Sequence, residues 1–165
     1  MFKDIIEIIK EKDRYLAELI YNIEKMIYVD SYTVILKGRT IGERIVKNII
    51  NNEDEYLSYD LTQKEKITLL QNRAILDDEI AKALNTIRIY GNKAIHDELE
   101  VAFESSLIVR RNLYKILDWY VLVYCDNSFE GKVYVEPDVI GKINNLERVT
   151  KNIINSTMKR FLFDA

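Results

Sequence analysis

The sequence predicts an all-α protein, an antiparallel bundle of long helices joined by few turns. Glycine and proline, which most often interrupt helices, are scarce, with five and one among 165 residues. Apolar residues recur every three or four positions through most of the chain, as one buried face of a helix requires. Helix-start signals lie between these apolar segments, and Thr62-Gln63-Lys64-Glu65 has the pattern of a capping box.

The N-terminal half is predicted to contain two long amphipathic helices. The first covers about residues 2–28, and its apolar face comprises Leu16, Leu19, Ile20, Ile23 and Ile27. Asp30 or Ser31 is expected to cap the second, over about residues 32–51. The inward face of this second helix comprises Val34, Gly38, Ile41, Ile45 and Ile49. Its glycine would let a neighbouring helix approach closely.

Three more helices are predicted before residue 125. The capping box starts a short helix at Thr62 that ends near Ala74. Acidic residues at Asp77 and Asp78 favour the start of the next, which runs through His96. Its inward face comprises Ile80, Leu84, Ile87, Gly91 and Ala94. A fifth helix, about residues 100–124, is the most hydrophobic and ends in core or interface aromatics.

The pattern changes after Cys125. Residues 126–140 are predicted to be a small non-helical excursion, in which residues 132–135 form a brief strand. A last amphipathic helix is expected over about residues 145–163. We expect a single domain over residues 1–165, made of an N-terminal helix (1–30), a helical core (32–124) and a C-terminal extension (126–165).

Composition limits the classes of function. The formal net charge of −3 gives no general attraction to nucleic acid or to an anionic membrane, so any RNA contact must be local. No apolar run approaches the roughly 20 residues of a membrane span, and no membrane partner is expected. The single cysteine, Cys125, excludes an intrachain disulfide and suits the cytoplasm. One histidine and one cysteine cannot form a conventional zinc site, and neither a metal nor a cofactor is expected.

Three polar side chains on the fourth helix form the candidate site. Arg88, Asn92 and His96 follow each other one turn apart, beside the apolar stripe. A guanidinium, an amide and an imidazole in a row can bind a phosphate and move a proton near neutral pH. A structural interpretation stays open. A histidine near a helix C-terminus complements the helix dipole, and the other two residues can form a polar network that fixes helix packing.

The segment Gly91-Asn92-x-Ala94-x-His96, with Ile87-Arg88 before it and Asp118-Trp119-Tyr120 on the following helix, resembles the HEPN superfamily of helical domains. Within it, the resemblance is to the branch of unknown function also found in motor subunits of type I restriction enzymes. Upstream, Arg39-Thr40-Ile41-Gly42-Glu43 matches the arginine-x-x-x-glutamate that this branch carries on an earlier helix. The resemblance covers about residues 32–124.

The resemblance implies a bundle of HEPN type, a homodimer, and a cytoplasmic role in nucleic-acid conflict such as defence against phage. Catalytic members are metal-independent endoribonucleases, in which histidine is the general acid or base and arginine stabilises the phosphate. The catalytic residues implied here are His96, Asn92 and Arg88. The implied substrate-binding residues are Arg39, Glu43 and Lys93. Because Gly91 stands where the pattern has its arginine, RNA or nucleotide binding is favoured over cleavage.

A non-enzymatic interaction or dimerisation module is the alternative. In this interpretation the polar stripe is structural, and Arg39 and Glu43 form a surface ion pair worth only about 0.3–0.5 kcal/mol. The apolar faces of the first and last helices would then dock a protein partner or a second subunit. Whether Arg88 and His96 line an open groove or are sealed inside helix contacts separates the two hypotheses.

Overall fold

The computed structural model describes residues 2–53, 60–96, 103–138, 143, 147–148 and 150–158. The chain divides into two compact units, residues 1–135 and 136–165. Residues 126–135, part of the predicted C-terminal extension, therefore belong to the first unit. Within the described ranges all regular structure is helical and no strand occurs, which confirms the all-α class.

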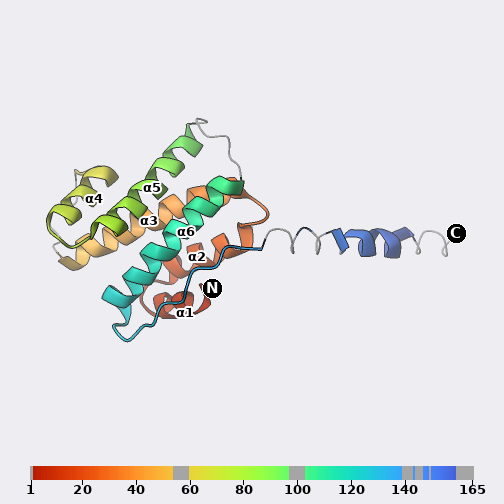
Figure 1. Ribbon diagram of the computed structural model, residues 1–165, viewed down its shortest axis with the longest axis horizontal. Helices are drawn as coiled ribbons and strands as arrows, with labels where there is room; N and C mark the ends of the chain where they lie inside the picture. The colour runs from red at the N-terminus through yellow and green to blue at the C-terminus, as the bar shows by residue number, and fades with distance from the viewer. Residues whose placement is uncertain are drawn as a thin grey trace. The chain divides into compact units, whose positions relative to one another are not determined.

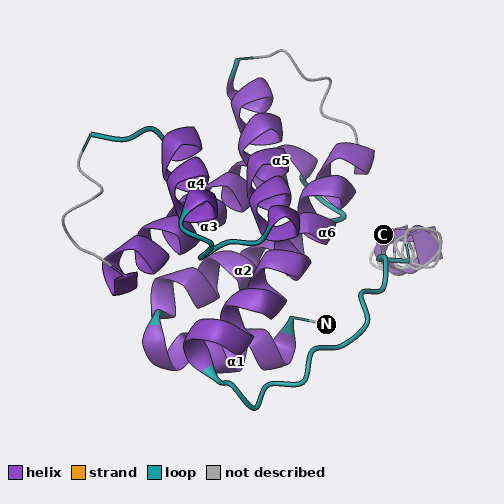
Figure 2. Cartoon of the chain, turned by 60° about the vertical axis from the view of Figure 1, so that its left-hand side comes forward, coloured by secondary structure: helices purple, strands orange, loops and turns teal. Residues whose placement is uncertain are grey.

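The first unit contains six α-helices and one π-helix within its described residues (Figure 1). They are α1 (Lys3–Lys12), α2 (Arg14–Met26), α3 (Ser31–Glu53), α4 (Gln63–Asn72), α5 (Asp78–Ile95), α6 (Phe103–Tyr120) and the π-helix η2 (Val121–Cys125). The long helix α3 packs against α2, α4, α5 and α6, so it is the centre of the bundle. Helices α5 and α6 lie side by side and run in opposite directions (Figures 1 and 2).

The predicted helix starts are confirmed at three places. Asp30 accepts a hydrogen bond from the backbone N–H of Thr33 at 3.0 Å, so the aspartate and not Ser31 caps α3. Thr62 and Glu65 form the reciprocal capping box at the start of α4. Asp77 accepts from the backbone N–H of Ile80 at 2.8 Å and caps α5. The start of the predicted fifth helix, at about residue 100, lies outside the described residues.

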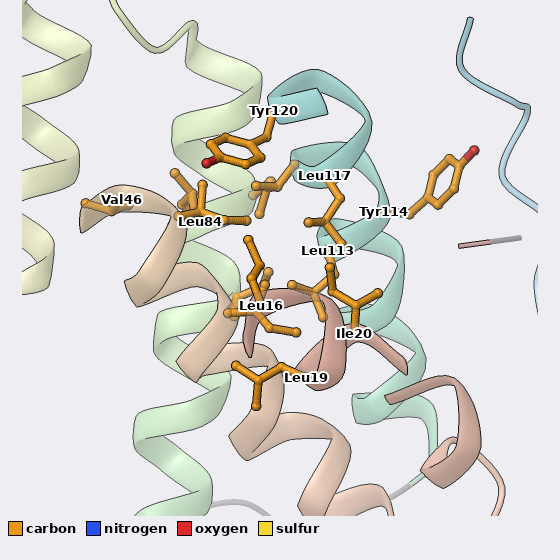
Figure 3. Packing of buried hydrophobic residues seen from close by; sticks show 14 of the residues in the cluster. Leu16, Leu19, Ile20, Val46, Leu84, Leu113, Tyr114, Leu117 and Tyr120 are labelled. Carbon is orange, nitrogen blue, oxygen red and sulfur yellow. The ribbon is translucent and has the colours of Figure 1, made fainter. Parts of the chain in front are cut away.

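The predicted apolar faces form the core. Every residue predicted to face inward on the first, second and fourth helices is buried. Figure 3 shows Leu16 of α2, Leu84 of α5, and Leu113 and Leu117 of α6 gathered in this cluster. Gly38 confirms the expected close approach, because a Cβ at this position would collide with Val109 of α6. The bundle is thus held by burial of aliphatic side chains from helices far apart in the sequence.

The prediction of one helix over residues 2–28 is wrong, because the segment bends at Asp13. This residue has φ −145° and ψ 86°, outside the helical region, and separates α1 from α2. Its carboxylate caps α2 by accepting from the backbone N–H of Leu16 at 3.0 Å. Arg44 and Asn48 of α3 also donate to it. The break is stabilised by contacts with α3 that periodicity along one segment cannot reveal.

The predicted strand at residues 132–135 is also wrong. This stretch carries no strand and is linked to α6 by side chains. The hydroxyl of Tyr114 donates to the carbonyl of Lys132 at 2.5 Å, and Arg110 donates to the hydroxyl of Tyr134 at 3.0 Å. The described residues contain no strand that could pair with this stretch, so the backbone ladder that defines a sheet cannot form. Residues 139–140 of the expected excursion lie outside the described residues.

The second unit contributes a helix at residues 150–158. Positions 145–146, 149 and 159–163 of the predicted last helix lie outside the described residues. Ile153, Ile154 and Met158 of this helix are exposed. Across both units, none of the described helices has the length and apolar character that crossing a membrane requires.

Candidate functional site

The side chain of Arg39, on α3, lies against Gly91, on α5. A Cβ built at Gly91 would lie 2.6 Å from Cβ of Arg39 and 2.7 Å from its Cδ, closer than real Cβ atoms come. The aliphatic part of the arginine therefore fills the space that any larger residue at position 91 would need. Gly91 is buried where α5 packs on α3, and Asn92 follows it in the chain. Because Gly91 has no side chain, the side chain of Arg39 can cross the surface of α5 at this position.

The guanidinium of Arg39 is oriented by Glu43. Its Nε donates to Oε1 of Glu43 at 2.8 Å, one turn further along α3. The two side chains are 29% and 42% exposed, so the ion pair itself adds only about 0.3–0.5 kcal/mol. Its main effect is to fix the direction of the guanidinium. Within the described residues, nothing accepts a hydrogen bond from the two terminal nitrogens of Arg39, which leaves them available to a ligand.

Arg88 and Asn92 both keep side-chain polar atoms that no described residue pairs. Arg88 is half-buried, and its Nε donates to Oδ1 of Asn85 on the same helix at 3.2 Å. Asn92 is also half-buried, and its backbone carbonyl accepts from the backbone N–H of His96 at 3.1 Å. Its side-chain amide has no hydrogen-bond partner among the described residues. The two terminal nitrogens of Arg88 likewise have no described acceptor.

His96 marks the end of α5. It is the C-cap residue, with φ −94° and ψ 14°, and its side chain is exposed. A cationic imidazole here would complement the negative end of the helix dipole, as the structural interpretation requires. The same exposure leaves the ring accessible to a ligand. The two interpretations of His96 are therefore both compatible with its position, but burial inside helix contacts is excluded.

The side chains of the stripe do not share one direction. At about 100° per residue, Arg88, Asn92 and His96 lie about 60°, 100° and 140° around the helix axis from Gly91. Lys93 lies about 200° from Gly91, which places it on the side away from Arg39. Lys93 is exposed. The structure thus brings Arg39, Glu43 and Gly91 together. Arg88 and Asn92 lie to one side of Gly91 on α5, and Lys93 lies apart.

Sequence reasoning missed a polar cavity on another face of α3. It has a volume of about 600 Å³, and residues of α1, α2, α3, α6 and η2 line it. Arg44, Asn48, Asn51 and Asn52 contribute its α3 wall. Their spacing along one helix was a signal that could have found the wall. The other walls of the cavity could not be predicted in this way, because they depend on the unexpected break between α1 and α2 at Asp13.

Within the described ranges, no group of three or more histidine, cysteine, aspartate or glutamate side chains could hold a metal ion. The side chains on the Arg39 side of α5 can bind an anion through a guanidinium and an amide, and can transfer a proton through an imidazole. Comparison with protein-family models, with curated proteins and with solved structures finds no match to this chain.

Proposed function

We propose that this chain is a HEPN-like helical domain that binds RNA or a nucleotide and acts in nucleic-acid defence in the cytoplasm. Arg39 of α3 supplies the arginine that the sequence pattern lacks at position 91. Asn92 and His96 of α5 complete the site. This assignment replaces Arg88 by Arg39 as the residue that holds the phosphate.

The packing of Arg39 on Gly91 is the observation that supports this assignment. In the pattern that the sequence resembles, an arginine stands immediately before the asparagine. Here the residue at that position is a glycine, and an arginine from a neighbouring helix occupies the adjoining space. Both arginines donate through Nε, Arg39 to Glu43 and Arg88 to Asn85, and the terminal nitrogens of both have no described acceptor. The contact with Gly91 is therefore what favours Arg39 as the phosphate ligand.

The site favours binding over cleavage. A bidentate guanidinium and an amide bind a phosphate without any further preparation. General acid–base catalysis needs an imidazole that a third group orients, and no described residue hydrogen-bonds to the ring of His96. If cleavage occurs, His96 transfers the proton of the RNA 2′-hydroxyl and Arg39 stabilises the charge that builds on the phosphate.

A homodimer through α5 fits this function. Ile89 and Ile95 are 41% and 47% exposed on the helix that carries the site. Burial of exposed isoleucines is a favourable contribution to association, at about 25 cal/mol per Å² of apolar surface. A dimer formed there would bring two copies of the stripe to one interface. A protein of dimeric mass in light scattering, shifted to the monomer by Ile95→Asp, would support this arrangement.

RNA binding in EDTA tests the proposal. A fluorescein-labelled single-stranded oligoribonucleotide should bind the wild type, and its affinity should fall as salt rises because phosphate contacts release counterions. Arg39→Ala should weaken binding about tenfold or more, which corresponds to about 1.4 kcal/mol. Arg73→Ala, at the exposed C-cap residue of α4, is the matched control and should bind as the wild type does. Absence of binding by the wild type would contradict the proposal.

A protein-interaction module is the second candidate function. It is favoured by one observation, the exposed apolar residues of the helix at residues 150–158. Ile153, Ile154 and Met158 are 59%, 50% and 57% exposed, which is unusual for a helix without a partner. Under this hypothesis Ile154→Asp should lower the molecular mass of the protein in solution, because it removes an association surface. Arg39→Ala should not change the affinity for the labelled RNA.

A further inference from the structure

The cavity of about 600 Å³ at the start of α2 has the size of a small-molecule site. It is separate from the site of the proposed function. Arg44 follows Arg39 by five positions on α3 and thus lies about 140° around the helix axis from it. Asn48 follows by nine positions and lies about 180° away. Neither Arg39 nor any residue of α5 lines the cavity.

Arg44 is held in a fixed orientation at the cavity. Its Nε and Nη2 donate to the two carboxylate oxygens of Asp13 at 2.6 and 2.8 Å, a bidentate ion pair. Its guanidinium also lies over the ring of Tyr15, at 4.9 Å from the centroid. The side chain remains 35% exposed. A guanidinium fixed in this way loses little conformational entropy when it binds an anion.

The charges around the cavity favour an anion. Lys12, Arg14 and Arg44 line it against one carboxylate, that of Asp13. Burial alone would raise the pKa of Asp13, but hydrogen bonds from Arg44, the Leu16 backbone and Asn48 together bring it below its ordinary value. Asp13 is therefore ionised and neutralised by its partners. Arg14 pairs with Glu18 outside the cavity at 3.4 Å, with both side chains largely exposed. The ammonium of Lys12 donates to the carbonyl of Tyr124 at 2.8 Å and forms no ion pair with a described carboxylate, so Lys12 supplies the unbalanced positive charge at the cavity.

Aromatic rings form another part of the wall. Tyr120 and Tyr124 stack with centroids 5.5 Å apart and an interplanar angle of 27°. Figure 3 shows Tyr120 at the margin of the apolar cluster. Tyr124 belongs to η2, and π-helical turns of this kind occur frequently at functional sites. Rings at a cationic cavity suit a planar, aromatic ligand, because stacking on such rings does not depend on base identity.

Amide groups complete the lining. Nδ2 of Asn48 donates to Oδ2 of Asp13 at 3.1 Å and to the Tyr120 hydroxyl at 3.4 Å. Asn51 and Asn52 follow on the same wall and are exposed. Their amides have no hydrogen-bond partner among the described residues. Such amides offer a donor and an acceptor side by side, which matches the edge of a nucleobase.

We propose that this cavity binds a free nucleoside monophosphate. The phosphate lies against Arg44, Lys12 and Arg14, and the base lies against the ring of Tyr124, which stacks on the buried Tyr120. Asn51 and Asn52 contact the edge of the base. The inference goes beyond the proposed function, because it concerns a different face of α3 and none of its residues belongs to the α5 site.

Calorimetric titration of the full chain with AMP tests the inference. One AMP should bind per chain, and adenosine or inorganic phosphate alone should each bind at least about tenfold more weakly. Asn51→Asp places a negative charge in the cavity and should weaken AMP binding about tenfold or more. Asn72→Asp is the matched control, because it makes the same change in the last turn of α4. Tyr15→Leu removes the ring under the Arg44 guanidinium and should weaken binding, whereas Tyr21→Leu, at a similarly exposed position on α2, should not.

Three results would overturn the inference. One is the absence of AMP binding at millimolar concentration. Another is equal weakening by the cavity variants and their controls. The third is binding of an oligoribonucleotide by this cavity without binding of AMP. Arg39→Ala distinguishes the two proposals, because it should leave AMP binding unchanged and weaken only the binding of RNA.

Discussion

Arg39 and Gly91 share one packing space between α3 and α5, in which the arginine stem fills what the glycine leaves empty. The size of residue 91 therefore controls both the spacing of two central helices and the position of a guanidinium. Stability and ligand binding depend on the same contact. The first prediction concerns stability.

Gly91→Ala should destabilise the fold by up to about 2 kcal/mol. The added methyl gains about 1 kcal/mol of helix propensity, but overpacking against Cβ and Cδ of Arg39 costs about 1–3 kcal/mol. Gly42→Ala on α3 is the control. Its Cβ would meet Ile87 and Leu84 at 3.7 and 3.8 Å, which is ordinary contact, so this variant should gain up to about 1 kcal/mol. Urea unfolding measures both changes, and equal effects of the two substitutions would contradict the packing described here.

Asp13→Asn should lower the free energy of unfolding at neutral pH by about 1–2 kcal/mol, because it removes the charge from the bidentate pair with Arg44. Hydrogen bonds hold the pKa of Asp13 below its ordinary value of 3.8. Its ionised form is thus favoured by folding, and this contribution disappears as the pH falls below 3.8. The variant and the wild type should converge in acid. Asp60→Asn, at an exposed position, should leave the free energy of unfolding unchanged both at neutral pH and in acid.

Asp118→Asn should have the opposite effect and stabilise the protein at neutral pH by about 0.5–1 kcal/mol. Oδ1 of Asp118 is buried and has no hydrogen-bond partner in the part of the chain that the structure describes, and Gly131 lies against the carboxylate. Burial raises the pKa of this group above 3.8, so the wild type loses stability as the pH rises from 3.8 through the raised pKa. The advantage of the variant should vanish below pH 3.8 in unfolding experiments. An advantage that persists in acid would refute this explanation.

His96→Ala should leave the fold intact, with a change within about 0.5 kcal/mol, because the side chain is exposed at the end of α5. Any cleavage of RNA in EDTA should be lost in this variant. Gel analysis of a labelled oligoribonucleotide measures cleavage, and circular dichroism verifies the fold. Undiminished cleavage by the variant would remove His96 from the mechanism.

The helices could be predicted because their signals are local. Thr62 and Glu65 form the capping box that their spacing indicates, and Asp77 caps the helix that follows. The break at Asp13 could not be predicted in this way, because apolar residues recur at helical spacing on both sides of it. Its carboxylate is held by Arg44 and Asn48, which are 31 and 35 positions away.

The sequence indicates which residues are candidates for the site, but it does not indicate how they are arranged in space. The sequence pointed to Arg39, Glu43, Asn92 and His96, but not to the contact between Arg39 and Gly91. That contact depends on how α3 packs against α5, which no pattern within either helix specifies. The sequence-based role of Arg88 rested on its position one turn before Asn92. Its bond to Asn85 depends on the rotamers of two side chains and could not be deduced from spacing.

A direct comparison of Arg39→Ala with Arg88→Ala tests the central claim most sharply. Both substitutions remove one half-buried arginine, and both can be measured by fluorescence polarisation with the same labelled oligoribonucleotide in EDTA. The account predicts a loss of affinity of about tenfold or more for Arg39→Ala, with a much smaller loss for Arg88→Ala. A loss of affinity confined to Arg88→Ala would contradict this account, because it would make Arg88 of α5 the residue that binds the phosphate.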